Sequence, residues 1–227
     1  MGTARPAPVT AALSDQSALA AFSASLTAIT LAELGDKTFF MALILAARHS
    51  ARPVFVGAFG ALTAVTLLSL ALGYGLRELV PTALLPWLAA ALFLGFGVKL
   101  LIDAQRMGRA GQEEDDEQEE AERAVAAAES RGTIQTMRAV IVEAFSLVFI
   151  AELGDRTQFT TIFLAAAPGF GFAALLAGTL LGHALVTWLA VGAGQWIGGR
   201  ISERWLYGLS GGLFLVFGLV ALKQALG

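Results

Sequence analysis

The chain has 227 residues, of which 56% are hydrophobic and 15% are charged, and its mean hydropathy is +0.70. Its formal net charge is −3, and it contains no cysteine. This composition excludes a water-soluble globular domain, which needs more polar surface, and it excludes disulfides and thiolate metal sites.

Six apolar stretches follow a short polar tail that has no signal-peptide pattern. They cover residues 19–47, 53–79, 83–105, 138–167, 171–198 and 204–225. Each is long enough to cross a hydrocarbon core of about 30 Å as a helix, which takes about 20 residues. The stretches are continuous and lack period-two alternation, which argues against a membrane barrel. We therefore predict an all-α membrane protein with six transmembrane helices.

The first and fourth stretches carry the same charged motif. Residues 32–37 have the sequence AELGDK, and residues 151–156 have the sequence AELGDR. In each copy the glutamate and the aspartate are three residues apart, which predicts that both project from one helix face. The glycine between them, Gly35 or Gly154, allows close helix approach or a local helix break that frees carbonyl oxygens.

An acidic run separates the third and fourth stretches. Residues 113–122, EEDDEQEEAE, hold eight of the eighteen acidic residues in the chain. A run of like charges is usually a solvated linker, although a role in collecting cations is an alternative. The alanine-rich sequence after it favours partial helix near the end of the segment.

The two halves of the chain repeat. Glu33 and Glu152 lie 119 positions apart (152 − 33), and residues 57–73 align with residues 178–194 at an offset of 121 (178 − 57). Because each half has three predicted helices, the second half would enter the membrane from the opposite side. We therefore predict inverted repeats, an architecture of many secondary transporters with a site at the membrane midplane. The predicted domains are a tail (1–18), repeat 1 (19–105), an acidic linker (106–137) and repeat 2 (138–227).

Basic residues predict the orientation, because they are enriched in cytoplasmic loops. The loops after the first, third and fifth stretches contain Arg48, Arg52, Arg106, Arg109, Arg123, Arg131, Arg138, Arg200 and Arg204, whereas the opposite side has Arg5, Arg77 and Lys223. This excess places the acidic segment in the cytoplasm and both termini outside.

Both motifs are predicted to lie near the bilayer centre, where an unpaired charge costs at least about 3 kcal/mol. Acidic and basic side chains at this depth are therefore not expected to face the lipid. The predicted symmetry axis brings the first and fourth helices together, so the acidic faces should converge on one site. The alternative is a set of ion pairs that only locks the helices together.

Such a site offers only oxygen ligands. Oxygen shells suit Ca²⁺, Mn²⁺ and Mg²⁺, whereas Zn²⁺ and copper usually recruit histidine or cysteine. Four carboxylates and two basic side chains sum to a charge of −2, which one divalent ion neutralises. Since protons bind the same carboxylates, the sequence favours a metal/proton exchanger.

Two copies of Glu-x-Gly-Asp-(Lys/Arg)-(Thr/Ser), each opening a three-helix repeat and separated by an acidic loop, resemble the family once catalogued as uncharacterised protein family sixteen. That family lies within the lysine-exporter superfamily and includes Golgi calcium/manganese transporters and bacterial manganese exporters of the Mne/Mnx type. The resemblance covers the chain after residue 19. It implies Ca²⁺ or Mn²⁺ transport in exchange for protons. For a compact six-helix chain of bacterial appearance, it implies Mn²⁺ export across the inner membrane.

The resemblance also implies roles for individual residues. It implies a metal site of Glu33, Asp36, Glu152 and Asp155, with Lys37, Thr38, Arg156 and Thr157 completing the two signatures. Gln158 continues the second motif, but Phe39 stands at that place in the first. We therefore expect the two halves of the site to differ chemically.

Other features are less specific. His183, in the middle of the fifth stretch, is either a proton relay or a histidine that hydrogen-bonds between helices. Gly208, Gly211 and Gly212 indicate close helix packing and not a nucleotide loop, because no strand precedes them and no Walker sequence occurs. We predict no ATP, no nucleic-acid partner and no permanently bound cofactor, with the lipid bilayer as surroundings and the metal ion and protons as substrates. The sequence does not predict an oligomeric state.

Two rival classes also place acids within a membrane. An intramembrane aspartyl protease would require Gly-x-Gly-Asp and two aspartates without basic neighbours, whereas glutamate occupies the first position here. A passive cation channel is the other alternative, although a duplicated carboxylate site is better suited to tight binding. We therefore predict a transporter and not an enzyme, with a Ca²⁺/H⁺ exchanger as the alternative to Mn²⁺ export.

Overall fold

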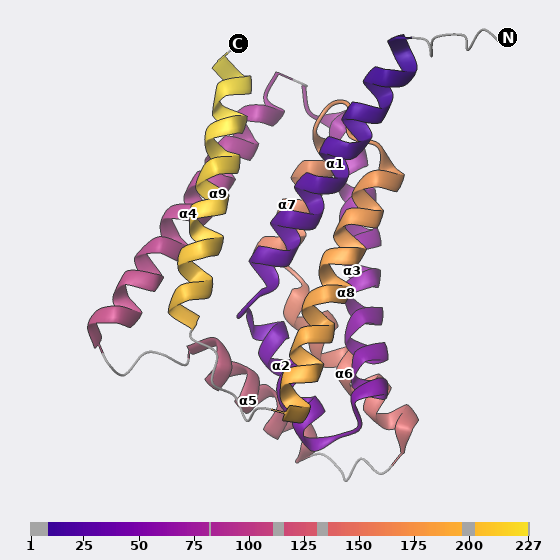
Figure 1. Ribbon diagram of the computed structural model, residues 1–227, viewed down its shortest axis with the longest axis vertical. Helices are drawn as coiled ribbons and strands as arrows, with labels where there is room; N and C mark the ends of the chain where they lie inside the picture. The colour runs from indigo at the N-terminus through magenta and orange to yellow at the C-terminus, as the bar shows by residue number, and fades with distance from the viewer. Residues whose placement is uncertain (1–8, 82, 111–115, 131–135, 197–202, 227) are drawn as a thin grey trace, which may run out of the picture.

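The computed structural model describes residues 9–81, 83–110, 116–130, 136–196 and 203–226, and within them every regular element is an α-helix (Figure 1). The helices are α1 (Val9–Glu33), α2 (Lys37–Arg48), α3 (Ala51–Leu79), α4 (Leu85–Ala110), α5 (Asp116–Glu129), α6 (Met137–Glu152), α7 (Arg156–Ala166), α8 (Phe172–Trp196) and α9 (Glu203–Leu226). The start of α1 and the end of α9 lie at one end of the bundle, and α5 lies at the other.

Some of the sequence predictions concern the N-terminal segment or residues outside the described ranges. Residues 9–18, predicted as a polar tail, form the first turns of α1, consistent with their alanine content. Residues 1–8, residues 113–115 of the acidic run, and Arg5, Arg131 and Arg200 lie outside the described residues.

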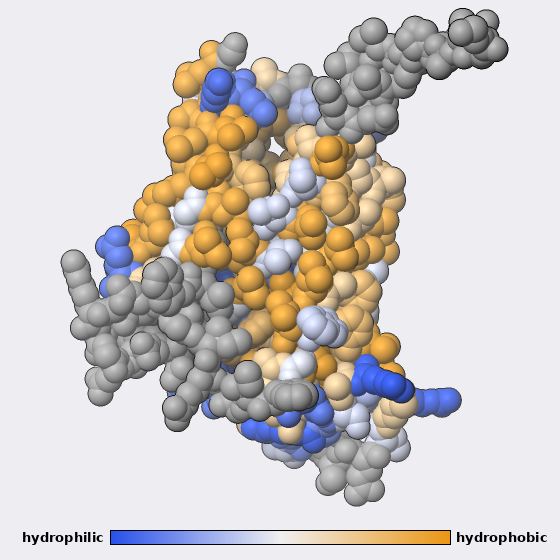
Figure 2. Space-filling model, viewed as in Figure 1, coloured by the Kyte–Doolittle hydropathy of each residue, from blue (hydrophilic) through white to orange (hydrophobic). Residues whose placement is uncertain are grey.

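The surface of the bundle is apolar over its middle (Figure 2). Large apolar side chains are exposed, among them Ile150 at 69%, Trp188 at 66% and Leu219 at 59%. Three helices are long and apolar enough to span a membrane, namely 51–79, 85–105 and 172–195, and the bent pair α1–α2 raises the number to four. The protein is therefore an all-α membrane protein, although length and hydropathy of the described residues do not confirm six crossings.

Each motif breaks its helix. α1 ends at Glu33 and α2 begins at Lys37, at an angle of 64°. The same interruption separates α6 from α7. Gly35 and Gly154 have φ angles of 75° and 87°, a left-handed conformation that glycine adopts without steric cost. The prediction that glutamate and aspartate share one helix face was therefore wrong, because the glycine between them ends the helix.

The helices pack in matching pairs across the two halves. α1 and α2 both contact α8, while α6 and α7 both contact α3. Gly57 and Gly73 of α3 lie against α6 and α7, and Gly178 and Gly194 of α8 lie against α1 and α2, so closely that an added Cβ would collide with backbone. Each α8 glycine is 121 positions after its α3 counterpart (178 − 57 and 194 − 73). Small residues thus let the broken helices approach α3 and α8 at equivalent positions.

α4 and α9 form a separate pair beside this group (Figure 1). Phe93, Phe96, Phe214 and Phe217 pack their rings between the two helices. A Cβ on Gly211 would touch α4, which confirms close packing there, but Gly208 and Gly212 face open space, so that prediction was wrong for them.

Candidate metal site at the paired helix breaks

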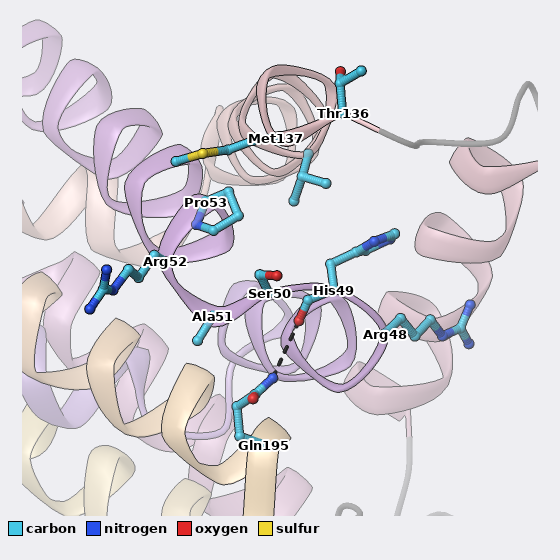
Figure 3. Close-up of a pocket in the computed structure, with 10 residues that line it drawn as sticks. Arg48, His49, Ser50, Ala51, Arg52, Pro53, Thr136, Met137 and Gln195 are labelled. Atoms are coloured by element: carbon cyan, nitrogen blue, oxygen red, sulfur yellow. Dashed lines mark hydrogen bonds between the residues drawn. The ribbon is translucent and has the colours of Figure 1, made fainter.

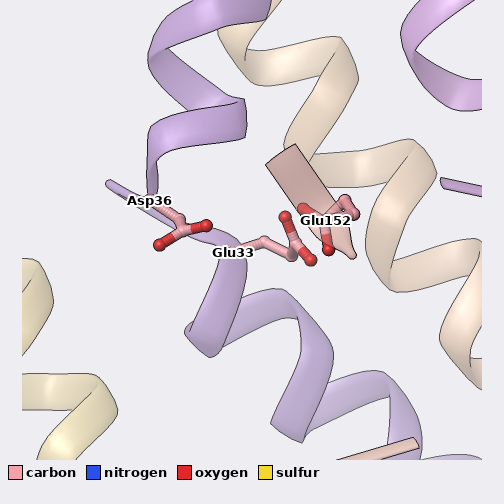
Figure 4. A group of neighbouring side chains, drawn as sticks. All are labelled: Glu33, Asp36 and Glu152. Atoms are coloured by element: carbon pink, nitrogen blue, oxygen red, sulfur yellow. The ribbon is translucent and has the colours of Figure 1, made fainter. Parts of the chain in front are cut away.

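The two helix breaks bring three carboxylates together. Each of Glu33, Asp36 and Glu152 offers an oxygen within 4.8 Å of the others, and their exposed fractions are 2%, 4% and 1%. Figure 4 shows the carboxylates of Glu33 and Glu152 facing each other from the ends of α1 and α6. The predicted convergence of the motifs therefore occurs for three of the four acids.

Both glutamates are held in the same way. Thr38 donates to Glu33 Oε2 at 3.1 Å, and Thr157 donates to Glu152 Oε2 at 2.9 Å. Among the described residues, none donates a hydrogen bond to Oε1 of either glutamate. A buried carboxylate oxygen without a donor is costly, and a bound cation or proton removes that cost.

The two aspartates have different partners. Asp36 is buried and forms an ion pair with Arg156 from the other motif. Asp155 is half-buried and caps α7, accepting from Thr157 N at 3.1 Å and from the Thr157 hydroxyl at 3.2 Å. Because the cap holds it on its own helix, Asp155 is not part of the three-carboxylate group. Asp155 still lies next to Glu152, because the Thr157 hydroxyl bonds to both carboxylates.

The two basic residues also differ. Arg156 lies across the site with its side chain 11% exposed, whereas Lys37 Nζ contacts Glu120 of α5 at 2.6 Å. The Asp36–Arg156 pair is neutral, and Glu33 and Glu152 together have a formal charge of −2. A divalent cation would neutralise that charge, while Asp155 adds a further negative charge next to Glu152.

Gln158 stabilises the second helix break. Its side-chain oxygen accepts a hydrogen bond from Gly154 N at 2.7 Å. Phe39, at the equivalent position of the first motif, packs edge-on against Phe40 at a centroid distance of 5.4 Å. The expected chemical difference between the two halves is therefore present beside the site.

His183 of α8 lies against the same centre. It is 4% exposed, and its Nδ1 is 3.4 Å from Glu33 Oε1 without hydrogen-bond geometry. The sequence left open a proton relay or a hydrogen bond between helices. The imidazole lies beside the Glu33 carboxylate and forms no hydrogen bond to it, so the structure leaves both interpretations open.

Two cavities lie near these elements. The larger, about 760 Å³, opens beyond the end of α2 and is lined by residues that include Arg48, His49 and Gln195 (Figure 3). The smaller is a narrow crevice without room for a water molecule, lined by Glu152, His183 and residues of α3 and α7. It contains Thr66, Ser69 and Thr161, which the sequence analysis missed. Their signal was a series of hydroxyl residues one helical turn apart in apolar sequence.

The fold and the site together indicate a class of membrane protein. The bundle has two broken helices, with buried oxygen ligands at the breaks. Discontinuous helices that meet at a charged centre are typical of ion-coupled secondary transporters. The model of the family described as divalent cation/proton antiporter GDT1 matches residues 21–108 and 140–227. The chain belongs to this GDT1 family, which confirms the resemblance seen in the motifs.

Individual relatives also support membership of the GDT1 family. The GDT1-like protein sll0615 of Synechocystis sp. is 44% identical over 204 residues, covering 89% of this chain and 97% of the relative. The protein PAM71, chloroplastic, of Arabidopsis thaliana is 41% identical over 216 residues, covering 89% of this chain and 56% of the relative. GDT1-like protein 1, chloroplastic, of Oryza sativa is 39% identical over 219 residues, covering 89% and 62%. The chain thus spans less than two thirds of the chloroplast relatives.

No solved structure matches the chain. Membership of the antiporter family makes the protein a multi-pass membrane transporter of divalent cations and protons, and not an enzyme.

Proposed function

We propose that the protein exports Mn²⁺ in exchange for protons through the carboxylate centre. The observation that carries this proposal is the facing pair Glu33 and Glu152, each fully buried, each bonded to a threonine and each with Oε1 free to accept a cation. Two carboxylates bind one divalent ion or two protons with the same change of charge. Metal and protons then compete, which is the basis of exchange.

The remaining motif residues support this centre. Asp36 would add a third carboxylate when Arg156 moves away, and Asp155 would do the same from the other half. Lys37 and Arg156 would act as internal counter-ions, while Thr38, Thr157 and Gln158 orient the ligands and the second break. His183 would pass protons to Glu33, given their separation of 3.4 Å.

The proposed architecture is two inverted repeats with six crossings, spanning residues 19–105 and 138–227. The matching contacts of α1 and α2 with α8, and of α6 and α7 with α3, support it. The family model matches twice, at residues 21–108 and 140–227, and these two ranges are close to the two proposed repeats. The site would then lie on the axis between the repeats, where a rocking movement of one against the other exposes it alternately.

The proposed location is a bacterial inner membrane, with α5 and the 106–137 segment in the cytoplasm and both termini outside. The arginine excess of the loops at the α5 end supports this orientation. Protons are more abundant outside a respiring cell, so exchange at an outward-facing site would drive metal out.

Flux measurements test the proposal. In proteoliposomes with the pH gradient and the membrane potential clamped separately, Mn²⁺ should move uphill when a pH gradient alone is imposed. Its apparent affinity should weaken as the pH falls, because protons occupy the same carboxylates. Flux driven by voltage and indifferent to the pH gradient would overturn exchange and favour a passive channel.

A competition series separates the two candidate metals. Mn²⁺ and Ca²⁺ accept the same oxygen ligands, but Mn²⁺ tolerates a smaller shell and nearby imidazole better. His183 beside Glu33 therefore favours Mn²⁺. Stronger inhibition of transport by Ca²⁺ than by Mn²⁺ at equal concentration would make the protein a Ca²⁺/H⁺ exchanger.

A further inference from the structure

The small crevice beside Glu152 is lined mainly by polar side chains. Thr66 and Ser69 of α3 face Gln158 and Thr161 of α7 across it, together with Thr157 and His183. Thr66, Ser69 and Thr161 are at most 3% exposed. Hydroxyl groups are seldom gathered in this way in a membrane interior, where each must find a partner.

One of these hydroxyls has no partner among the described residues. Thr66 Oγ1 is buried, and no described residue forms a hydrogen bond with it. Ser69 donates its proton to Val65 O at 2.7 Å, which leaves its oxygen lone pairs directed away from that bond. Oxygen atoms in this state are ligands for a hard cation.

The crevice extends from the centre in one direction. Ser69 is one turn beyond Thr66 along α3, and Thr161 is one turn beyond Thr157 along α7. Both helices run from the centre towards the end of the bundle where α1 begins and α9 ends (Figure 1). There Arg77 donates to Ala165 O at 2.6 Å and closes the gap between α3 and the end of α7.

The equivalent place in the other half is less polar. Ser69 corresponds to Ala190 (69 + 121), Thr161 to Ala42 (161 − 119) and Gln158 to Phe39 (158 − 119). All three counterparts are buried, at 0%, 2% and 3% exposure. Thr66 corresponds to Thr187 (66 + 121), which is buried as well. The two sides of the centre therefore differ in polarity at Ser69, Thr161 and Gln158, and not at Thr66.

We propose that Thr66, Ser69 and Thr161 line the path by which the divalent cation passes between the carboxylate centre and the end of the bundle that carries the chain termini. This inference rests on the proposed function. The crevice is too narrow for a water molecule in this structure, so α7 must move from α3 for the path to open. During that movement the hydroxyl oxygens replace part of the hydration shell of the ion.

Single cysteines test the path, because the chain contains none. Thr161→Cys and Ser69→Cys are compared with Ala42→Cys and Ala190→Cys, their counterparts in the other half. A membrane-impermeant thiosulfonate reagent is added to oriented vesicles from each side. From the side of the termini, the first two should react at least about tenfold faster than the second two, since reactivity follows local opening. Saturating Mn²⁺ should slow their reaction. Equal rates for both pairs, or rates that Mn²⁺ does not change, would overturn the path.

Hydroxyl removal provides a second measurement that does not depend on thiol chemistry. Thr66→Val and Thr161→Val should lower the maximal Mn²⁺ flux about tenfold with little change in KM, because they remove ligands used in transit and not at the centre. Thr63→Val is the matched control, since Thr63 lies on α3 outside the crevice and bonds to Phe59 O. Wild-type flux in both variants would refute the path.

The two proposals fail separately. Absence of pH-driven flux in the wild-type protein would overturn the proposed function whatever the labelling pattern. Normal wild-type exchange with no preference for the Thr161 and Ser69 positions would leave the function and remove the path.

Discussion

α2 and α7 follow equivalent helix breaks but have different surroundings. Every residue of α2 from Thr38 to Ala46 is buried, whereas α7 exposes Phe159 at 38%. α5 covers α2 through Ala121 and Val125, both fully buried, and Arg48 at the end of α2 forms an ion pair with Glu129. α7 instead borders the hydroxyl-lined crevice.

This difference shows that a repeated motif does not make two equivalent half-sites. Arg156, the first residue of α7, reaches across to Asp36, while Lys37, the first residue of α2, contacts α5. α2 is therefore packed from Thr38 to Ala46, whereas α7 borders the crevice with the additional polar side chains. In an alternating-access cycle, the two sides of the centre would open by different movements.

The largest expected effect tests what the two halves share. Glu33→Gln or Glu152→Gln removes one charge of the pair while keeping the size of the side chain. Mn²⁺ transport should then fall on the order of 100-fold or more, because loss of a metal ligand costs at least as much activity as loss of a residue that hydrogen-bonds to a ligand. Both variants should still fold. Flux in proteoliposomes and thermal stability in detergent are the measurements, with the exposed Glu78→Gln as control. A variant with wild-type flux at saturating metal would show that its carboxylate is not an essential ligand.

The second prediction compares the two equivalent basic residues. Arg156→Gln removes one half of a buried ion pair with Asp36, which should lower the unfolding free energy by about 3–5 kcal/mol. Lys37→Gln breaks a contact whose acid, Glu120, is 60% exposed, and should cost less than about 1 kcal/mol. Thermal unfolding of the two variants side by side provides the comparison. Equal destabilisation would mean that the two halves are energetically alike.

The helices could be predicted because long apolar stretches are a strong signal. The acidic centre could be predicted because charged residues are rare within such stretches. It could not distinguish Asp36 from Asp155, since one is paired across the bundle and the other caps its own helix. The packing of α5 was also missed. Its signal was the small apolar stripe of Ala121 and Val125, four residues apart, within an acidic segment. The different partners of Asp36 and Asp155 arise from tertiary contacts, which the sequence of the motif does not predict.

The third prediction tests packing that the halves share. Gly57→Ala and Gly178→Ala would each place a Cβ against backbone of the neighbouring broken helix, so both should destabilise by about 1–3 kcal/mol. Gly75→Ala in α3 and Gly192→Ala in α8 are matched controls, because each faces open space. There alanine should be neutral or stabilise the helix by up to about 1 kcal/mol. Unequal costs for Gly57 and Gly178 in thermal unfolding would contradict equivalent contacts.

The smallest expected effect tests whether α5 restrains α2. Glu120→Gln removes the ion pair between α5 and Lys37, and the lost stability should be less than about 1 kcal/mol because the pair is partly exposed. The functional effect should be larger than the stability effect, since α2 can then separate from α5 more often. In an Ala42→Cys background, Glu120→Gln should therefore increase the rate of thiol labelling from the α5 side. Arg123→Gln is the control, because Arg123 pairs with Glu119 within α5 itself. If both variants changed the labelling rate equally, α5 would act through its net charge and not through its contact with α2.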